Sequence, residues 1–271
     1  LATLSARQTA IAKTLTAFPT ATLRATATRP PRPTATPVPS TVVLNMIAIP
    51  SGDFVMGSSD DDLQLTLQEC NQTEGNCQID WFAGEQPART VFVDAFSISK
   101  YEVTNAQYNV CVANQVCPPI GRLPVDVDIP YKAGFFAASL PAVAVSWDNA
   151  NLFCQWIGAR LPSEAEWEKA ARGVDGSRRY PWGATFSPGR ANLSSAGPKA
   201  VGSYPSGASP YGVMDMAGNV FEWTATATDD GRDIVRGGGW SKFYFRGRVT
   251  DRGTKLVPNF VNYDIGFRCA R

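Results

Sequence analysis

The chain has 271 residues, a net charge of +1 and no histidine. Most zinc sites, the histidine-dependent iron sites and the Ser-His-Asp and Cys-His catalytic centres all need an imidazole, so these classes are excluded. The balanced charge, with no long basic run beyond the N-terminal tail, argues against nucleic acid as a partner.

Residues 1–41 differ in composition from the rest of the chain. They are mostly Thr, Ala, Pro and Arg and contain no Cys, Trp, Gly or acidic residue. Such a segment cannot bury enough apolar surface to offset its ordering entropy, so we predict a largely disordered stalk or linker. Within it, residues 26–41 are predicted as an extended spacer and residues 4–18 as a short helix of marginal stability. Residues 42–271 then make one domain of ordinary size.

The first strands of the domain are predicted from short apolar runs. Residues 46–57 hold two such runs joined by Pro-Ser-Gly-Asp, which predicts a hairpin, and residues 89–101 predict a second pair of strands. From residue 172 onward regular signals nearly vanish, and Gly, Pro, Ser and Asn dominate. This pattern predicts an α+β fold with few helices, short strands and much irregular chain.

Capping signatures predict three helices, at residues 104–113, 146–157 and 163–172. In the second of them apolar residues recur at helical spacing and place Cys154 on the core side. Glu164, Glu166 and Glu168 begin the third helix and alternate too quickly to share one face. We therefore interpret them as partners of the helix dipole and solvated charges, not as catalytic acids.

The six cysteines are even in number and fall into a pattern typical of disulfides. Cys70 and Cys77 bracket one short loop, and Cys111 and Cys117 bracket another. The alternative is six reduced, buried thiols in a cytosolic protein. Together with a Pro/Thr stalk, three disulfides favour an extracellular or cell-surface setting. No run of 18 apolar residues occurs, so membrane attachment is expected only through an anchor upstream of Leu1.

Six phrases of the sequence occur in a recognisable order. They are residues 49–57 (Ile-Pro-Ser-Gly-Asp-Phe-Val-Met-Gly), 101–108 (Tyr-Glu-Val-Thr-Asn-Ala-Gln-Tyr), 145–147 (Val-Ser-Trp), 160–168 (Arg-Leu-Pro-Ser-Glu-Ala-Glu-Trp-Glu), 218–223 (Gly-Asn-Val-Phe-Glu-Trp) and 266–269 (Gly-Phe-Arg-Cys). In this order they resemble the formylglycine-generating enzyme (sulfatase-modifying factor) family, a variant of the C-type lectin fold. The resemblance covers about residues 46–271. It implies a disulfide between Cys154 and Cys269, with a buried free thiol at each position as the alternative.

The resemblance also bears on catalysis. Catalytic members of the family oxidise a cysteine of a client sulfatase to formylglycine with copper held by two cysteines, two and seven residues after the aromatic residue of an Arg-Gly-Gly-Ser-aromatic motif. Here that motif ends Gly239-Trp240, and the two positions are Lys242 and Gly247. Neither side chain can bind Cu(I) or exchange with a thiol, so no copper is expected. An iron-dependent branch of the superfamily needs a histidine cluster, so no iron is expected either.

Calcium is the one cofactor that the resemblance still implies. In the family a calcium ion lies near the Gly-Asn-x-x-Glu-Trp loop, and the corresponding positions here are Asp215, Gly218, Val220 and Glu222. Carboxylates and carbonyls from an irregular loop suit this hard cation. The alternative is that Asp215 and Glu222 only cap loop amides. The family's second calcium site needs an acidic loop after Asn192, and residues 194–199 contain no acid.

The last irregular stretch is the usual ligand face of the C-type lectin fold, and residues 240–264 occupy it here. The predicted ligand-binding residues combine aromatic rings with cations, as binding hot spots do; they are Trp240, Lys242, Phe243, Tyr244, Phe245, Arg246, Arg248, Phe260 and Tyr263. At least two of Phe243, Phe245 and Phe260 are predicted to be exposed. The alternative is that about half of the rings fill the core.

A second resemblance concerns the ends of this stretch. Variable proteins of diversity-generating retroelements use the same fold and frame a hypermutated segment with similar motifs, here residues 238–240 (Gly-Gly-Trp) and 265–268 (Ile-Gly-Phe-Arg). The leading hypothesis is a non-catalytic extracytoplasmic domain that binds a protein or other macromolecule through residues 240–264, a segment that could be hypervariable. The alternatives are a copper-dependent oxidase that converts a client sulfatase cysteine to formylglycine, and a purely structural module on a stalk.

Overall fold

The computed structural model describes residues 42–120, 133–228, 231–253 and 255–271. The helix predicted at residues 4–18, the spacer at 26–41 and the stalk as a whole lie outside the described residues. The boundary between residues 41 and 42 therefore stays a prediction. Within the described part of the chain, no helix is both long and apolar enough to cross a membrane.

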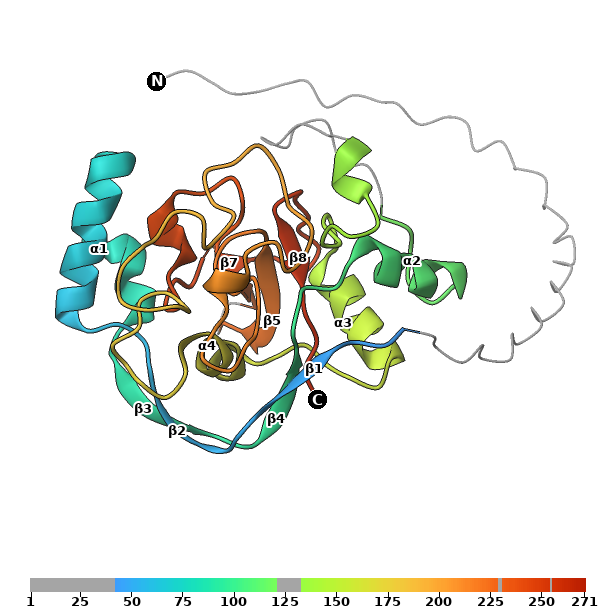
Figure 1. The fold of residues 1–271 in the computed structure, drawn as a ribbon, viewed down its shortest axis with the longest axis horizontal. Coiled ribbons are helices and arrows are strands. Elements are labelled where there is room, and N and C mark those ends of the chain that lie inside the picture. Colours follow the sequence, from blue (N-terminus) through green and yellow to red (C-terminus); the bar gives the residue numbers. More distant parts are fainter. Residues whose placement is uncertain (1–41, 121–132, 229–230, 254) are drawn as a thin grey trace, which may run out of the picture. The chain divides into compact units, whose positions relative to one another are not determined.

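The first four strands form two antiparallel ladders (Figure 1). Strand β1 (Met46–Ile49) pairs with β4 (Phe96–Ser99), and β2 (Gly52–Met56) pairs with β3 (Arg89–Val93). The predicted hairpin over residues 46–57 is therefore wrong, because β1 and β2 do not pair with each other. Gly52, at φ +138°, takes the chain from the first ladder into the second. Each strand thus finds its partner some forty residues away, which local turn chemistry does not reveal.

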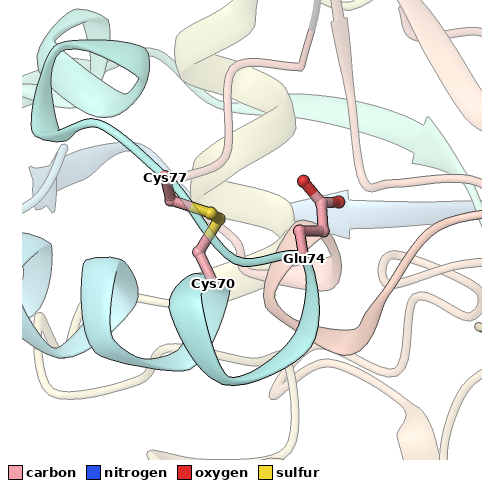
Figure 2. Close-up of side chains that lie close together, drawn as sticks. All are labelled: Cys70, Glu74 and Cys77. Carbon is pink, nitrogen blue, oxygen red and sulfur yellow. A yellow bond between two sulfur atoms is a disulfide. The ribbon is translucent and has the colours of Figure 1, made fainter.

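An insertion between β2 and β3 holds two elements that the sequence analysis did not predict. Helix α1 (Asp60–Thr73) begins at a capping box made by Ser59 and Asp62, and the 3₁₀ helix η1 (Ile79–Glu85) follows. A disulfide between Cys70 and Cys77 joins the end of α1 to the chain that leads into η1 (Figure 2). The capping signature at Ser59 was present in the sequence and could have predicted the helix.

The three predicted helices are confirmed as α2 (Asn105–Ala113), α3 (Trp147–Trp156) and α4 (Glu164–Arg172), each with a side-chain N-cap. Short 3₁₀ turns occur at η2 (Ala133–Phe136), η3 (Pro205–Gly207) and η4 (Tyr244–Gly247). Helices α3 and α4 both pack on the strand β5 described next. The interpretation of the α4 glutamates as solvated is wrong, since Glu164, Glu166 and Glu168 are 3%, 8% and 1% exposed.

A four-stranded sheet organises the C-terminal half. Its order is β7 (Lys255–Leu256), β6 (Asp233–Arg236), β5 (Phe221–Ala227) and β8 (Ile265–Phe267). Strands β5, β6 and β7 are antiparallel neighbours, whereas β8 runs parallel to β5. The rest of this half is irregular, as predicted, so the sheet and the two helices on β5 hold long loops in place.

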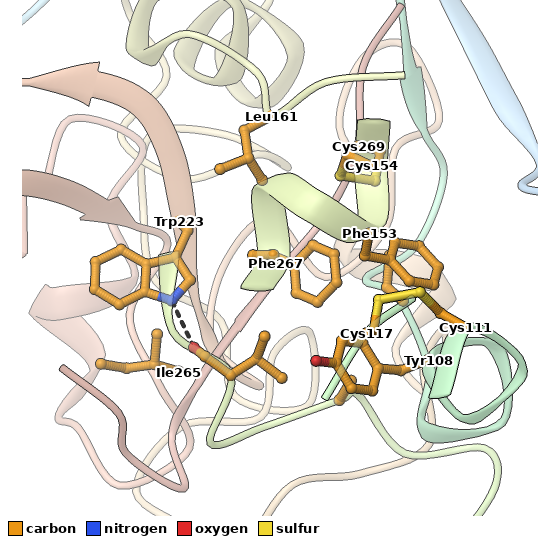
Figure 3. Packing of buried hydrophobic residues seen from close by; sticks show 14 of the residues in the cluster. Tyr108, Cys111, Cys117, Phe153, Cys154, Leu161, Trp223, Ile265, Phe267 and Cys269 are labelled. Carbon is orange, nitrogen blue, oxygen red and sulfur yellow. Dashed lines mark hydrogen bonds between the residues drawn. A yellow bond between two sulfur atoms is a disulfide. The ribbon is translucent and has the colours of Figure 1, made fainter. Parts of the chain in front are cut away.

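The largest core cluster lies between α2, α3 and the sheet (Figure 3). The rings of Tyr108, Phe153 and Phe267 pack together there, beside the disulfide between Cys154 and Cys269. This disulfide spans 115 residues, a loop for which chain entropy gives an upper figure of about 4–5 kcal/mol. A disulfide also joins Cys111 to Cys117, so all six cysteines are paired.

Candidate functional site

Trp240 and Tyr263, at the two ends of the predicted ligand segment, belong to the interior. They are 6% and 1% exposed, and the Trp240 indole Nε1 donates a hydrogen bond to the Tyr263 carbonyl at 3.1 Å. Both rings pack around Phe135. The prediction that these two residues contact a ligand is wrong, because their ring faces are used to hold the segment's ends together.

Phe245 and Arg248 are buried as well, at 0% and 1% exposure. Phe245 packs edge-on against Phe82 of η1, and the Arg248 guanidinium makes a bidentate ion pair with Glu85 at 2.7 and 2.8 Å. These two predicted ligand contacts are therefore also wrong. The expectation of two exposed rings among Phe243, Phe245 and Phe260 fails, since Phe260 is half-buried and only Phe243 is exposed.

Four of the predicted ligand-binding residues, all within positions 242–246, reach the surface. Phe243 is 41% exposed, and Lys242, Tyr244 and Arg246 are half-buried. The Phe243 ring lies parallel to the buried Phe245 ring, at a centroid distance of 6.4 Å. A ring with one face on a buried neighbour and its other parts in solvent is held in place while it remains available for contact.

Two further rings, which the ligand-site prediction missed, extend this surface. Phe186 stacks on Tyr244 at a centroid distance of 4.9 Å, and Trp182 lies 6.4 Å from Phe186. Trp182 also stacks on the buried Tyr180, at 5.2 Å and 12° between the planes. We call the four partly exposed rings of Trp182, Phe186, Phe243 and Tyr244 the aromatic strip. The Tyr-Pro-Trp-Gly phrase at residues 180–183 was the sequence signal for its second half.

Positions 242 and 247 both contact residues 193–194, and position 247 has little space for a larger side chain. The Lys242 carbonyl accepts a hydrogen bond from the Ser194 amide at 2.8 Å. Gly247 is buried, and a Cβ atom there would lie 2.7 Å from Leu193 Cδ1. A larger residue at position 247 would therefore require Leu193 to move.

A cluster of buried acids lies where β5 begins. Glu222 is fully buried and accepts hydrogen bonds from Arg268 at 2.6 and 2.7 Å and from the Trp167 indole at 2.7 Å. Asp215, which is 7% exposed, accepts one from the Gly202 amide at 2.6 Å. The cluster thus joins residues from α4, the loop before β5, β5 itself and the chain directly after β8.

Glu102 is the third acid of this cluster, and the metal-site prediction missed it. It is 1% exposed and accepts hydrogen bonds from the Asn219 side chain at 2.7 Å and from the Val220 amide at 3.3 Å. Burial, together with the charges of Asp215 and Glu222, raises the pKa of Glu102 well above its usual range. Burial raises the pKa of Asp215 to about 6. Among the described residues, the guanidinium of Arg268 is thus the one cation that offsets the three carboxylates of this cluster.

The family model of the sulfatase-modifying factor enzyme 1-like domain matches residues 31–271. The chain belongs to this family. A curated relative, the "Inactive C-alpha-formylglycine-generating enzyme 2" of Mus musculus, is 32% identical over 280 residues, which cover 83% of this chain and 85% of the relative. The predicted membership of the formylglycine-generating enzyme family is thereby confirmed.

Solved structures agree with the predicted fold. The structure of PvdO from Pseudomonas aeruginosa matches with a TM-score of 0.65 and 26% identity, over 83% of this chain and 93% of that one. Treponema denticola variable protein 1 matches with a TM-score of 0.62 and 19% identity, over 86% and 97% of the two chains. The second likeness is one of fold alone. The α+β, C-type lectin-like architecture of this family member is confirmed.

Within this family, Lys242 and Gly247 stand where the resemblance places the copper-binding cysteines of catalytic members. The side chain of Leu193 occupies the space beside position 247, and every cysteine of the chain is in a disulfide. One grouping of two sulfurs and a carboxylate does occur among the described residues, at Cys70, Glu74 and Cys77 (Figure 2). Its sulfurs are bonded to each other, so they offer no thiolate to a metal.

The acid cluster contains two of the residues that the family resemblance assigns to calcium. Glu222 Oε1 accepts one hydrogen bond and Oε2 accepts two, and among the described residues the hydrogen bond to Asp215 goes to its Oδ2 and not to Oδ1. Both oxygens thus keep lone pairs for a cation. The surplus of negative charge and the hard oxygen donors fit calcium. Asp215 also caps a loop amide, that of Gly202, whereas the Val220 amide is capped by Glu102.

Proposed function

We propose that the domain is a non-catalytic member of its family that binds a protein or other macromolecule through the aromatic strip. The observation that carries this proposal is the juxtaposition of Trp182, Phe186, Tyr244 and Phe243, from two segments about sixty residues apart, as partly exposed rings on a buried aromatic layer. Rigid aromatic rings beside cations are the usual anchors of macromolecular interfaces. The strip keeps two of the ligand residues expected from the sequence, Phe243 and Tyr244, and adds Trp182 and Phe186.

The absence of a usable thiol pair supports the non-catalytic half of the proposal. A copper oxidase of this family would need thiolates at positions 242 and 247, and the chain has Lys242 and Gly247 there, with Leu193 filling the adjacent space. To test this, the full chain is loaded with Cu(I) and incubated with a cysteine-containing sulfatase peptide, and aldehyde formation is followed by mass spectrometry. We expect no product, and turnover would establish the oxidase instead.

The binding half is tested with paired variants of the full chain. Phe243→Ala and Tyr244→Ala remove rings of the strip, whereas Phe92→Ala removes a more exposed ring, 62% exposed on β3. We expect the first two variants to lose the molecules that the wild type captures from the surface fraction of its host, and the third to retain them. If all four proteins capture the same molecules, the strip is not the ligand site and the domain is better described as a structural module.

An extracellular or cell-surface location and a structural calcium ion complete the proposal. Three disulfides are typical of oxidising compartments. Asp215 and Glu222 would hold the calcium ion, and its charge would offset the surplus of acid at the start of β5. To test the location, cysteine alkylation of the protein is measured in intact cells and again after the disulfides are reduced. We expect alkylation only after reduction.

We further propose that residues 241–264 vary between strains. The support is that family-like motifs frame a segment of idiosyncratic composition, in which Lys242, Phe243 and Tyr244 reach the surface. Sequencing the locus in sibling strains tests the idea. Adenine-directed differences confined to codons 241–264 are expected, and uniform silent drift across the gene would contradict it.

A further inference from the structure

We infer that the partner contacts the aromatic strip with an acidic polypeptide segment that carries an apolar anchor. This inference rests on the proposed function and specifies the chemistry of the ligand. It is drawn from the sign of the charges that reach solvent beside the strip, compared with the position of the acids that lie beneath it.

The cations beside the strip reach solvent. Lys242 precedes Phe243 and is half-buried, and Arg190 closes the turn that follows Phe186. Among the described residues neither makes an ion pair with a carboxylate, and Arg190 Nη1 donates only to the Ser206 carbonyl, at 2.9 Å. A third cation, Arg246, lies over the rings of Phe245 and Phe82 at 5.4 and 5.8 Å.

The acids near these cations are buried or already bound. Asp251, which pairs with Arg246 at 3.3 Å, is 1% exposed, and Asp264, which is near Lys242, is 2% exposed. Glu69, whose charge acts on Tyr244, accepts two hydrogen bonds from Arg179 at 2.8 and 2.9 Å. A partner therefore meets cations at the rim of the strip, while the balancing carboxylates lie under the surface. Acidic groups on the partner complement such a rim and speed its association.

The arrangement favours a polypeptide over an anionic polysaccharide. Protein interfaces place aromatic anchors at the centre and charges at the rim, which is the order found here from Phe186 and Tyr244 out to Arg190 and Lys242. A polyanion is recognised mainly through a continuous row of Lys and Arg. Beside the strip, the described cations Lys242 and Arg246 form no such row, because three aromatic residues stand between them along the chain.

A random-peptide phage library, panned against the immobilised full chain, tests the inference. We expect enrichment of peptides in which Asp or Glu flank a large apolar residue. The charge reversal Lys242→Glu combined with Arg190→Glu should lower the affinity of a selected peptide more than about 10-fold and, on renewed panning, select basic peptides. Lys255→Glu, a reversal at an exposed site on β7, is the matched control and should change the affinity less than about 2-fold.

The outcomes separate this inference from the proposed function. Peptides that need Phe243 and Tyr244 but show no acidic preference, or that ignore the charge reversal, would overturn the inference and leave the strip as a binding site. Peptides whose binding is unaffected by Phe243→Ala and Tyr244→Ala would overturn both. Binding of heparin by the wild type, lost in the charge-reversed variant and accompanied by no peptide selection, would assign the site to an anionic polysaccharide and refute the inference.

Discussion

Around α4 and at the start of β5 the protein buries two clusters of charges, and they are balanced differently. In the α4 cluster, Glu164 and Glu168 both bind Arg236, at 2.8 and 2.6 Å, and Arg252 and Arg172 add further guanidinium groups. In the β5 cluster, Arg268 is the one described guanidinium that acts on Glu102, Asp215 and Glu222. Both clusters lie in the interior, so the difference is one of charge and not of burial.

The pKa of Glu164 shifts in the opposite direction to the pKa values of Glu102 and Asp215, as this difference in charge predicts. Burial alone would raise the pKa of Glu164, but the charges of Arg236 and Arg252 hold it below its usual value. In the β5 cluster burial prevails, and the pKa values of Glu102 and Asp215 rise. A balanced cluster is self-sufficient when it is fully hydrogen-bonded, whereas an unbalanced one must bind a proton or a further cation.

Removing the central cation of the balanced cluster should have the largest effect. Arg236→Ala leaves Glu164 and Glu168 buried without their shared partner, and we expect a loss of about 3–5 kcal/mol in the free energy of unfolding. Urea unfolding measures it. Arg190→Ala is the control and should stay within about 0.5 kcal/mol, because this half-buried arginine makes no ion pair with the residues that the structure describes. Equal effects of the two substitutions would show that the α4 cluster contributes little.

Adding a cation to the unbalanced cluster should have the next largest effect. Calcium at about 100 times its Kd is expected to stabilise the protein by about 2–3 kcal/mol, and magnesium by less. Because the folded pKa of Asp215 is raised to about 6 without metal, protons compete with calcium below that value. The rise in melting temperature should therefore be full near neutral pH and shrink as the pH falls through about 6.

The variant Asp215→Asn tests whether calcium binds at the β5 cluster. It removes one carboxylate of the β5 cluster and should weaken the calcium effect, whereas Asp94→Asn, on the exposed turn between β3 and β4, should not. Calorimetry with and without calcium compares the three proteins. If calcium stabilises all three proteins equally, it binds at another site. The excess negative charge of the β5 cluster is then neutralised by bound protons.

Another buried acid, Asp233, has no ion pair among the described residues and provides the smallest test. Asp233, at the start of β6, is 4% exposed, and its Oδ2 has no hydrogen-bond partner among the described residues. Burial and the charge of Asp148 raise its pKa to about 6. The folded protein therefore binds more protons than the unfolded chain between pH of about 4 and 6, so this residue's contribution to stability falls as the pH rises through that window.

Replacing this acid with its amide should therefore stabilise the protein. Asp233→Asn is expected to raise the free energy of unfolding by about 1–2 kcal/mol above pH of about 6.5, with the gain disappearing below pH of about 4. Denaturant unfolding across this pH range measures the difference from the wild type. A gain that does not depend on pH would point to packing and not to the buried charge.

How far the sequence predicted each element depended on the distance over which its structure is determined. The capping signatures before α2, α3 and α4 act within one helical turn, and all three helices are present. The hairpin at residues 46–57 failed because its two strands have stronger partners at 89–99. Helix α1 was overlooked although Ser59 and Asp62 supplied the same local signal.

The residues of the candidate site fall into the same two groups, those whose role follows from local sequence and those whose role depends on distant partners. The sequence by itself determined the family and the loss of thiols at positions 242 and 247, and it predicted the pairing of six cysteines that the structure shows. Only the tertiary structure decided that Phe245 and Arg248 are buried under α1 and η1, that Phe186 joins Tyr244 at the surface, and that Glu102 completes the acid cluster. Residue types are local properties, whereas burial and charge balance depend on partners that folding brings from distant parts of the chain.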